Sequence, residues 1–196
     1  MSKIRLAREE DVPGILEIYR PYIENTTITF EYEVPSAGAF FRRFQEITAR
    51  CPWLVAEEDG VLLGYAYADR AFVRAAYSWA ADLSVYLREK DRGRGRGRRC
   101  YTIVEQMIAR QGYQVVYGLV TSDNEPSRRF HHAMGYRETA LLPDCGYKLG
   151  KWLGVYWYEK RLCPPIPPGA MPVPAPRMDW SQVELPQWPD VEIQLI

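Results

Sequence analysis

The sequence predicts an α/β domain with a mixed central sheet. Strand-like and helical segments follow the order β-α-α-β-β-β-α-β-α-β-β up to about residue 162. The 196-residue chain is 47% hydrophobic and 26% charged, a composition that can build one domain with its own core. Asp59-Gly60 between two strand-like runs predicts a hairpin, so part of the sheet is expected to be antiparallel.

The elements follow from hydrophobic periodicity and from end signals. Strands are expected at 4–7, 53–58, 61–68, 79–87, 113–121, 136–142 and 154–162. Helices are expected at 12–23, after Ser36, from about Gly95 to Gly112, and from Asn124 to Gly135. Asp11, Ser36 and Asn124 are polar residues of the types that cap helix N-termini. The apolar run 113–121 is typical of a central strand, and 24–34 is expected to be extended or loop-like.

The last 34 residues differ in composition from the rest. Nine of the fifteen prolines lie in 163–196, and apolar periodicity is absent there. We therefore divide the chain into a domain at 1–162 and a proline-rich C-terminal extension at 163–196. The run PPIPPGAMPVPAP favours polyproline II. Two alternatives remain for this extension: loose order, or anchoring through Trp180 or Trp188.

Charge and cysteine usage restrict the class of protein. The 25 basic and 25 acidic residues give a net charge of +0, which argues against nucleic acid as a partner. The four cysteines are widely spaced, which favours a reducing compartment over a disulfide framework and predicts no metal site. Neither a signal peptide nor a membrane-spanning run is recognisable. We expect a cytoplasmic protein without membrane association.

The stretch DRGRGRGRRC at 91–100 contains five arginines and three glycines. It lies between a strand that ends near Leu87 and a helix that begins within it. Free backbone N–H groups at a helix N-terminus, the helix dipole and nearby arginines favour bound phosphate. A nucleic-acid-binding arm and a solvated loop are the alternatives. An arm is usually longer and carries aromatic residues between its arginines, so we favour a phosphate cradle.

The hexapeptide 92–97, RGRGRG, resembles the R/Q-x-x-G-x-G/A motif of the GNAT superfamily of N-acetyltransferases. The segments IRLAREEDVPGILEIYRPYIENTTITFE, YSWAADLSVYL, NEPSRRFHHAMGY and GYKLGKWLGVYWYEK resemble, in order, the phosphinothricin acetyltransferase group of that superfamily. The resemblance covers about residues 3–162. It implies the GNAT fold, acetyl-CoA as donor and co-substrate, and a homodimer.

The resemblance also implies residues that bind acetyl-CoA. The end of the fourth strand would pair with the pantetheine arm, with the Val85 N–H facing the thioester oxygen. The arginine loop would hold the pyrophosphate, and the N-terminus of a later helix would complete the site. The implied residues are Val85, Tyr86, Leu87, Arg92, Gly93, Arg94, Gly95, Arg96, Gly97, Arg98 and Asn124. Val85 and Leu87 are equally suited to a core, and Asn124 to a helix cap.

Two side chains are candidates for proton transfer. Asp82 stands where the family commonly has glutamate, and its carboxylate can accept the proton of the attacking amine, directly or through water. His131 stands where many GNAT enzymes have a tyrosine that protonates the leaving thiolate. An imidazole titrates near neutral pH and suits this role. For each residue a purely structural role is the alternative, and His132 is expected to be non-catalytic.

The acceptor site is the least defined by the sequence. By resemblance, Arg74 before Tyr77 belongs to a loop that binds an anionic acceptor. A second basic residue that the family often has two positions earlier is Phe72 here, which questions phosphinothricin as the acceptor. Phe30 and Glu31 are candidates for the opposite wall of the cleft.

The sequence therefore predicts direct acetyl transfer from acetyl-CoA to the amine of a small amino-acid-like acceptor. Phosphinothricin and methionine sulfoximine are examples of the class. The alternatives are an N-acetyltransferase acting on a protein or peptide, and a non-catalytic acyl-CoA-binding module.

Overall fold

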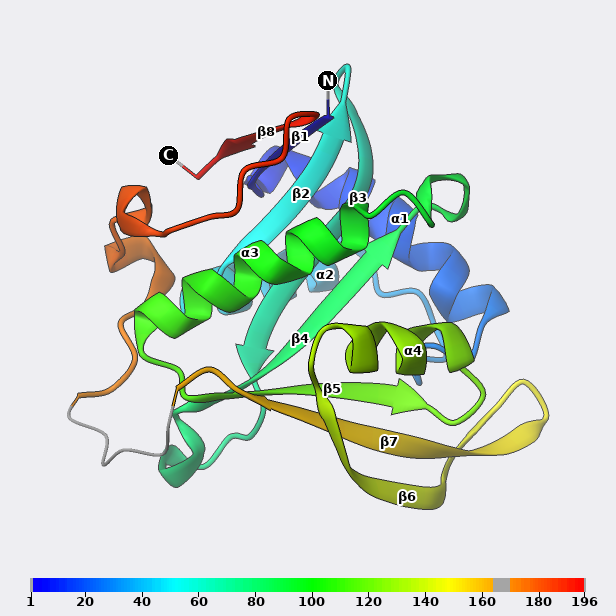
Figure 1. The fold of residues 1–196 in the computed structure, drawn as a ribbon. Helices are drawn as coiled ribbons and strands as arrows, with labels where there is room; N and C mark the ends of the chain where they lie inside the picture. Colours follow the sequence, from blue (N-terminus) through cyan, green and yellow to red (C-terminus); the bar gives the residue numbers. More distant parts are fainter. Residues whose placement is uncertain (1, 164–169, 196) are drawn as a thin grey trace.

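Eight strands form one mixed sheet in the order β6-β7-β5-β4-β3-β2-β1-β8 (Figure 1). The computed structural model describes residues 2–163 and 170–195. The strands are β1 (Ser2–Leu6), β2 (Trp53–Glu58), β3 (Val61–Arg70), β4 (Ala80–Leu87), β5 (Val115–Thr121), β6 (Arg137–Lys148), β7 (Lys151–Arg161) and β8 (Val191–Gln194). The α-helices are α1 (Val12–Asn25), α2 (Ala37–Thr48), α3 (Arg96–Gln111) and α4 (Glu125–Ala133). The predicted α/β class is confirmed.

The predicted antiparallel meander is also confirmed. Strands β2, β3 and β4 pair in antiparallel order, and the hairpin between β2 and β3 turns at Asp59 and Gly60. Both residues have positive φ, 51° and 76°, as a two-residue primed turn requires.

β4 and β5 run parallel and pair over only three residues each. The last pair joins Asp82 to Tyr117, although β4 continues to Leu87 and β5 to Thr121. The remaining edge of β4 is therefore not paired with β5, and the two strands open toward their carboxyl ends. Backbone N–H and C=O groups on such an edge are available to a ligand.

The helices cover both faces of the sheet. α3 and α4 lie on one face and α1 and α2 on the other (Figure 1). On the second face Trp53 stacks on Tyr65 and Tyr67, and Phe40 of α2 packs against its edge. β5 lies between β4 and β7, so its predicted central position is confirmed.

The helix ends follow most of the predicted signals. The Ser36 hydroxyl accepts from the Ala39 N–H, and Asn124 accepts from the Ser127 N–H. Asp11 occupies the predicted N-cap position of α1, but its side chain makes no cap hydrogen bond. Its buried carboxylate instead accepts from the Arg5 guanidinium of β1 at 2.7 and 2.8 Å.

Residues 170–195 fold onto the same sheet. β7 ends at Arg161, beside the predicted boundary at 162, but β8 pairs in parallel with β1 and so extends the sheet. Trp180 is 8% exposed and belongs to the hydrophobic core. This favours the anchored alternative over loose order. Part of the proline-rich run, 164–169, lies outside the described residues.

This segment also runs alongside α3 (Figure 1). Near the end of α3, the Gln111 side-chain amide donates to the Val173 carbonyl at 2.6 Å. Near its start, Arg99 pairs with Asp190 at 2.8 Å and lies over the Trp188 ring. Both ends of α3 are thus held by the C-terminal segment.

Candidate active site

The arginine loop forms a turn that requires glycine at two positions. Gly93 and Gly95 have φ of 77° and 76°, in the left-handed region that side chains with a Cβ disfavour. α3 begins directly afterwards, at Arg96, and its first bonded amide is that of Arg99, which donates to the Gly95 carbonyl at 3.1 Å. The amides of the preceding residues are not used by the helix. Free amides at a helix N-terminus favour a bound anion, so this geometry is compatible with the predicted phosphate cradle.

The arginines of this loop divide into two groups. Arg92, Arg94 and Arg98 are exposed. Arg96 is buried, and its guanidinium donates to Glu58 of β2 at 3.2 Å. The Arg96 side chain was expected at the phosphate and instead pairs with the β2–β3 hairpin, because the first turn of α3 packs on that hairpin. Its backbone amide remains at the helix N-terminus.

Val85 presents its backbone to the open edge of β4. The Arg88 N–H donates to the Leu63 carbonyl on β3 at 2.8 Å, and residues of the same parity turn toward β3. Val85, of opposite parity, therefore turns its N–H and C=O toward β5, beyond the last β4–β5 pair. The Val85 and Leu87 side chains lie under the start of α3, near Gly97.

The backbone of Leu87 has a different partner from the one expected. Its N–H donates to the Tyr22 hydroxyl at 3.0 Å, and its carbonyl accepts from that hydroxyl at 2.5 Å. Arg92 lies over the Tyr22 ring, 5.0 Å from its centroid. In this structure Tyr22 thus occupies the two groups that were expected to pair with pantetheine. A cavity of about 520 Å³ opens at this point, between α1 and the arginine loop.

A second cavity of about 540 Å³ lies at the N-terminus of α4. Asn124 lines it, together with the α1–α2 loop and the β6–β7 turn. The elements around it are tied by Asp123, which accepts from Thr27 at 2.9 Å and from Lys151 at 2.6 Å. The two cavities lie at the two elements that were expected to hold the donor, the arginine loop and the start of α4.

Asp82 lies at the point where β4 and β5 separate. It is partly exposed, faces Asp69 across the β3–β4 pair, and adjoins Tyr117 on β5. Desolvation by burial, with a smaller contribution from the Asp69 charge, raises the pKa of Asp82 to about 7. A carboxylate with this pKa is matched to proton transfer near neutral pH.

His131 lies beside the same point, on the α4 side of the sheet. Its Nε2 would be 2.3 Å from a Cβ at Gly118, the residue after Tyr117, so only glycine allows this contact. Nδ1 donates to the Ser127 carbonyl at 2.8 Å, which leaves Nε2 to accept from the Tyr101 hydroxyl at 3.1 Å. Burial lowers the pKa of His131. The ring is 5% exposed, and both of its nitrogens have partners.

Arg74 and Tyr77 lie in the β3–β4 loop and are exposed. Tyr77 packs against Phe72, with ring centroids 4.6 Å apart. Phe72 also stacks on Trp157 of β7, at 5.8 Å. The structure therefore surrounds position 72 with aromatic side chains rather than with charge.

Phe30 and Glu31 lie in the α1–α2 loop, as expected. The Phe30 ring occupies the space that a Cβ at Gly146 of β6 would need, so the loop contacts the β6–β7 hairpin. Glu31 accepts from Arg43 at 2.7 Å and from the Tyr19 hydroxyl at 2.9 Å. The Glu31 carboxylate is thus held by partners on α1 and α2 and is partly exposed.

Three residues of this region were missed by sequence reasoning. Tyr22, Asp69 and Tyr101 contact or face expected site residues, yet their segments are distant from those residues in the chain. Helical periodicity marks Tyr22 and Tyr101 only as apolar-face residues. No local pattern could have identified them.

Residues 2–163 and 170–195 contain no cluster of His, Cys, Asp and Glu suited to hold a metal ion. None of their helices has the length and apolar character needed to span a bilayer.

Comparison with known proteins identifies a matching protein family and similar proteins. The model of the Acetyltransferase (GNAT) domain matches residues 4–157. A phosphinothricin N-acetyltransferase from Streptomyces viridochromogenes is 33% identical over 85% of this chain and 91% of its own length. An L-methionine sulfoximine/L-methionine sulfone acetyltransferase from Pseudomonas paraeruginosa is 33% identical over 83% of this chain and 96% of its own.

A solved structure agrees with the sequence match. An acetyltransferase from Salmonella typhimurium, with its cofactor acetyl-CoA, superimposes with a TM-score of 0.82 at 27% identity. The match covers 86% of this chain and 98% of the other.

Proposed function

We propose which residues of this chain carry each step of its reaction. The chain belongs to the GNAT family of acetyltransferases and transfers acetyl from acetyl-CoA to the amine of a small amino-acid-like acceptor. The arrangement of β4, β5 and α3 fits the donor. The unpaired edge of β4 can pair with an extended amide chain, and the free amides of Gly93 to Arg98 can bind phosphate. The exposed Arg92, Arg94 and Arg98 would add attraction for the pyrophosphate.

The Tyr22 hydroxyl would have to leave the backbone groups of Leu87 before a ligand could pair with them. This hydroxyl occupies the N–H and C=O of Leu87, whereas the Val85 groups face the opening. We propose that pantetheine pairs first with Val85 and that contact with Leu87 requires the Tyr22 hydroxyl to move. Asn124 would line the far end of the donor site.

Asp82 is the proposed base, and its position at the opening of β4 and β5 is the observation that carries the mechanism. The acceptor arrives as an ammonium and must lose a proton before its lone pair can attack the thioester carbon. Asp82 would take this proton, through a water where the shorter aspartate does not reach. The amide bond forms as the C–S bond breaks, and the Val85 N–H would stabilise charge on the thioester oxygen.

His131 is proposed to protonate the leaving thiolate. Its hydrogen bonds allow this role only if Nε2 is protonated first. With Nδ1 donating to the Ser127 carbonyl, the neutral ring has no proton on Nε2, which accepts from Tyr101. His131 would act as an acid only after Nε2 is protonated, which burial disfavours. A role in packing against Gly118 is the alternative.

The acceptor is proposed to lie on the face of the sheet that carries Asp82, between the β3–β4 loop and the α1–α2 loop. Arg74 and Tyr77 belong to the first loop, and Phe30 and Glu31 to the second. Phosphinothricin and methionine sulfoximine are the first acceptors to test, because relatives act on them.

The decisive experiment is release of the CoA thiol from acetyl-CoA, followed with a panel of amino acids and their analogues. In Asp82→Asn we expect kcat/KM to fall about 10²–10⁴-fold, with the dissociation constant of acetyl-CoA unchanged. In the parent protein kcat/KM should rise with pH through about 7, because Asp82 acts only when ionised. Asp82→Asn should lose this rise.

Two results would contradict this assignment. Full activity of Asp82→Asn would exclude Asp82 as the base. A loss of less than tenfold in His131→Ala would assign His131 to packing. Met134→Leu, a conservative change after the end of α4, serves as the control for disturbance of that helix end.

We also propose a homodimer in the cytoplasm. Large apolar side chains are exposed on the β5–β6–β7 part of the sheet: Leu119, Leu141, Leu142, Tyr147, Leu149 and Trp152. Such a surface is typical of an interface between subunits. The four cysteines are free, in keeping with a reducing compartment. Analytical ultracentrifugation would test the dimer, which a monomer at micromolar concentration would contradict.

A further inference from the structure

Four aromatic side chains form a cluster beside Asp82, which we call the aromatic wall: Phe72, Tyr77, Tyr117 and Trp157. Phe72 is at its centre. The Phe72 ring is nearly parallel to Trp157, at 9° and 5.8 Å, and lies 4.6 Å from Tyr77 and 6.0 Å from Tyr117. Tyr117 and Trp157 are 5.7 Å apart.

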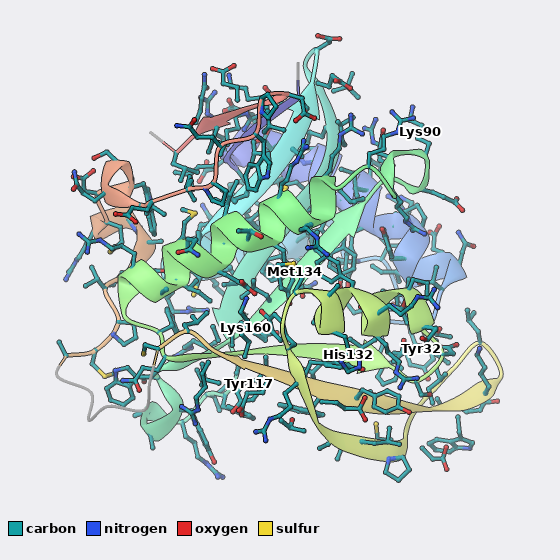
Figure 2. All side chains as sticks on the ribbon, in the orientation of Figure 1. Tyr32, Lys90, Tyr117, His132, Met134 and Lys160 are labelled. Atoms are coloured by element: carbon teal, nitrogen blue, oxygen red, sulfur yellow. The ribbon has the colours of Figure 1, made fainter. Side chains whose placement is uncertain are left out.

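The strand register places this wall on the same face of the sheet as Asp82. Asp82 pairs with Tyr117 on the adjacent parallel strand, so their side chains are neighbours. Trp157 pairs with Leu119, two residues beyond Tyr117, and therefore points to the same face. In Figure 2, Tyr117 lies below this part of the sheet, whereas Lys160, which contacts α3, lies above it. An amine at Asp82 on this face would therefore have Tyr117 of the aromatic wall as a neighbour.

The wall differs from the other aromatic stack on the same face. Trp53 and Tyr65 are fully buried beneath α1 and α2. Tyr77 is 47% exposed, and Phe72, Tyr117 and Trp157 are each partly exposed. The rings of the aromatic wall thus contact one another and also leave surface that a small molecule can contact.

The polar groups of the wall fit an α-amino acid. The indole N–H of Trp157 is buried and has no hydrogen-bond partner among the described residues. Arg74 stands two residues from Phe72 and is exposed. The exposed guanidinium of Arg74 can meet the acceptor's carboxylate, while the rings contact its side chain.

We propose that the aromatic wall binds the side chain of the acceptor, and that the preferred acceptors are α-amino acids with an aromatic or large apolar side chain. This rests on the proposed function, because it requires the acceptor amine at Asp82. An apolar side chain gains burial and stacking against the rings. A second anionic group on the acceptor would lose hydration at the aromatic wall, and no positive charge would compensate because position 72 is phenylalanine.

The test compares kcat/KM for L-phenylalanine, L-tryptophan, L-alanine, phosphinothricin and methionine sulfoximine. In the parent protein we expect the aromatic amino acids to exceed L-alanine and phosphinothricin by tenfold or more. Phe72→Arg should lower kcat/KM for L-phenylalanine at least tenfold and raise it for phosphinothricin. The matched control Val73→Arg places the same charge next door on a side chain that is 87% exposed, and it should leave the preference unchanged.

A second variant protects the test against misfolding of Phe72→Arg. Tyr77→Ala removes an exposed ring and should lower kcat/KM for L-phenylalanine severalfold, with little change for L-alanine. A preference of the parent protein for L-alanine or phosphinothricin would overturn the proposal. So would equal shifts in Phe72→Arg and Val73→Arg.

Two further outcomes separate this proposal from others. Loss of the dimer in Phe72→Arg, with acceptor preference unchanged, would assign the wall to an interface between copies and overturn the proposal. If acetyl-CoA binds but none of the acceptors causes release of the CoA thiol, the proposed function itself would be overturned. Release with anionic acceptors alone would overturn only the assignment of the aromatic wall.

Discussion

The proposed donor half and the proposed acceptor half of the site use different parts of the chain. The donor half uses backbone: the unpaired edge of β4, two glycines with positive φ, and the free amides at the start of α3. The acceptor half uses side chains, from the β3–β4 loop, β4, β5 and β7, gathered around Asp82.

This difference explains why the donor half can be predicted from the sequence and the acceptor half cannot. A backbone site needs glycine at fixed places in a short segment, and residues 92–97 supply them together. A side-chain site needs only that distant residues meet. Phe72 and Trp157 are separated in the sequence by β4, β5 and β6 and become neighbours only through the order of the strands. Acceptor preference can therefore differ between related chains while the donor stays the same.

The largest effect on the donor half should come from the C-terminal segment. Trp180→Ala empties a core position that is 8% exposed, and we expect a loss of about 3–5 kcal/mol in the free energy of unfolding. Because the segment runs along α3, the affinity for acetyl-CoA should fall as well. Thermal unfolding and calorimetric titration would measure the two. Met171→Ala, at a side chain that is 55% exposed, should change neither.

A loss of stability without any change in acetyl-CoA affinity would lead to a different conclusion. It would show that the donor half stands on β4 and α3 alone. The C-terminal segment would then serve only the core.

A tenfold effect is expected at the glycine turn. Gly95→Ala forces an L side chain into φ of 76°, at a cost of about 1–2 kcal/mol, although the added methyl meets no neighbouring atom. Acetyl-CoA should bind about tenfold more weakly, with the KM of the acceptor unchanged. Gly38→Ala is the matched control, since this glycine of α2 has no positive φ and room for a methyl. A change confined to acceptor KM would break the division into two halves.

The smallest effect should be a shift in pH dependence. The charge of Asp69 helps to raise the pKa of Asp82, so Asp69→Asn should lower that pKa. More of the base is then ionised below pH 7, and kcat/KM at pH 6 should rise severalfold relative to its value at pH 8. A pH profile would measure it. Glu10→Gln, which removes an exposed carboxylate, should leave the profile in place.

The fold could be predicted almost element by element, because its signals are local. The Asp59-Gly60 turn, the Ser36 and Asn124 caps and the apolar run of β5 all behave as their sequence indicates. Asp11 does not, since a cap signal cannot show that Arg5 lies within reach of the same carboxylate. β8 was also missed, because four residues in a segment rich in proline carry no periodicity of their own.

The mixed α/β sheet, the glycine turn before α3 and the position of Asp82 on the fourth strand follow from the amino-acid sequence alone. Each depends on residues adjacent in the chain, whose spacing fixes local conformation. The three-dimensional packing sets which arginines of the loop stay exposed, brings Tyr22 to Leu87 and places Phe72 among aromatic rings. These depend on packing between distant segments, where burial and charge act over space rather than along the chain.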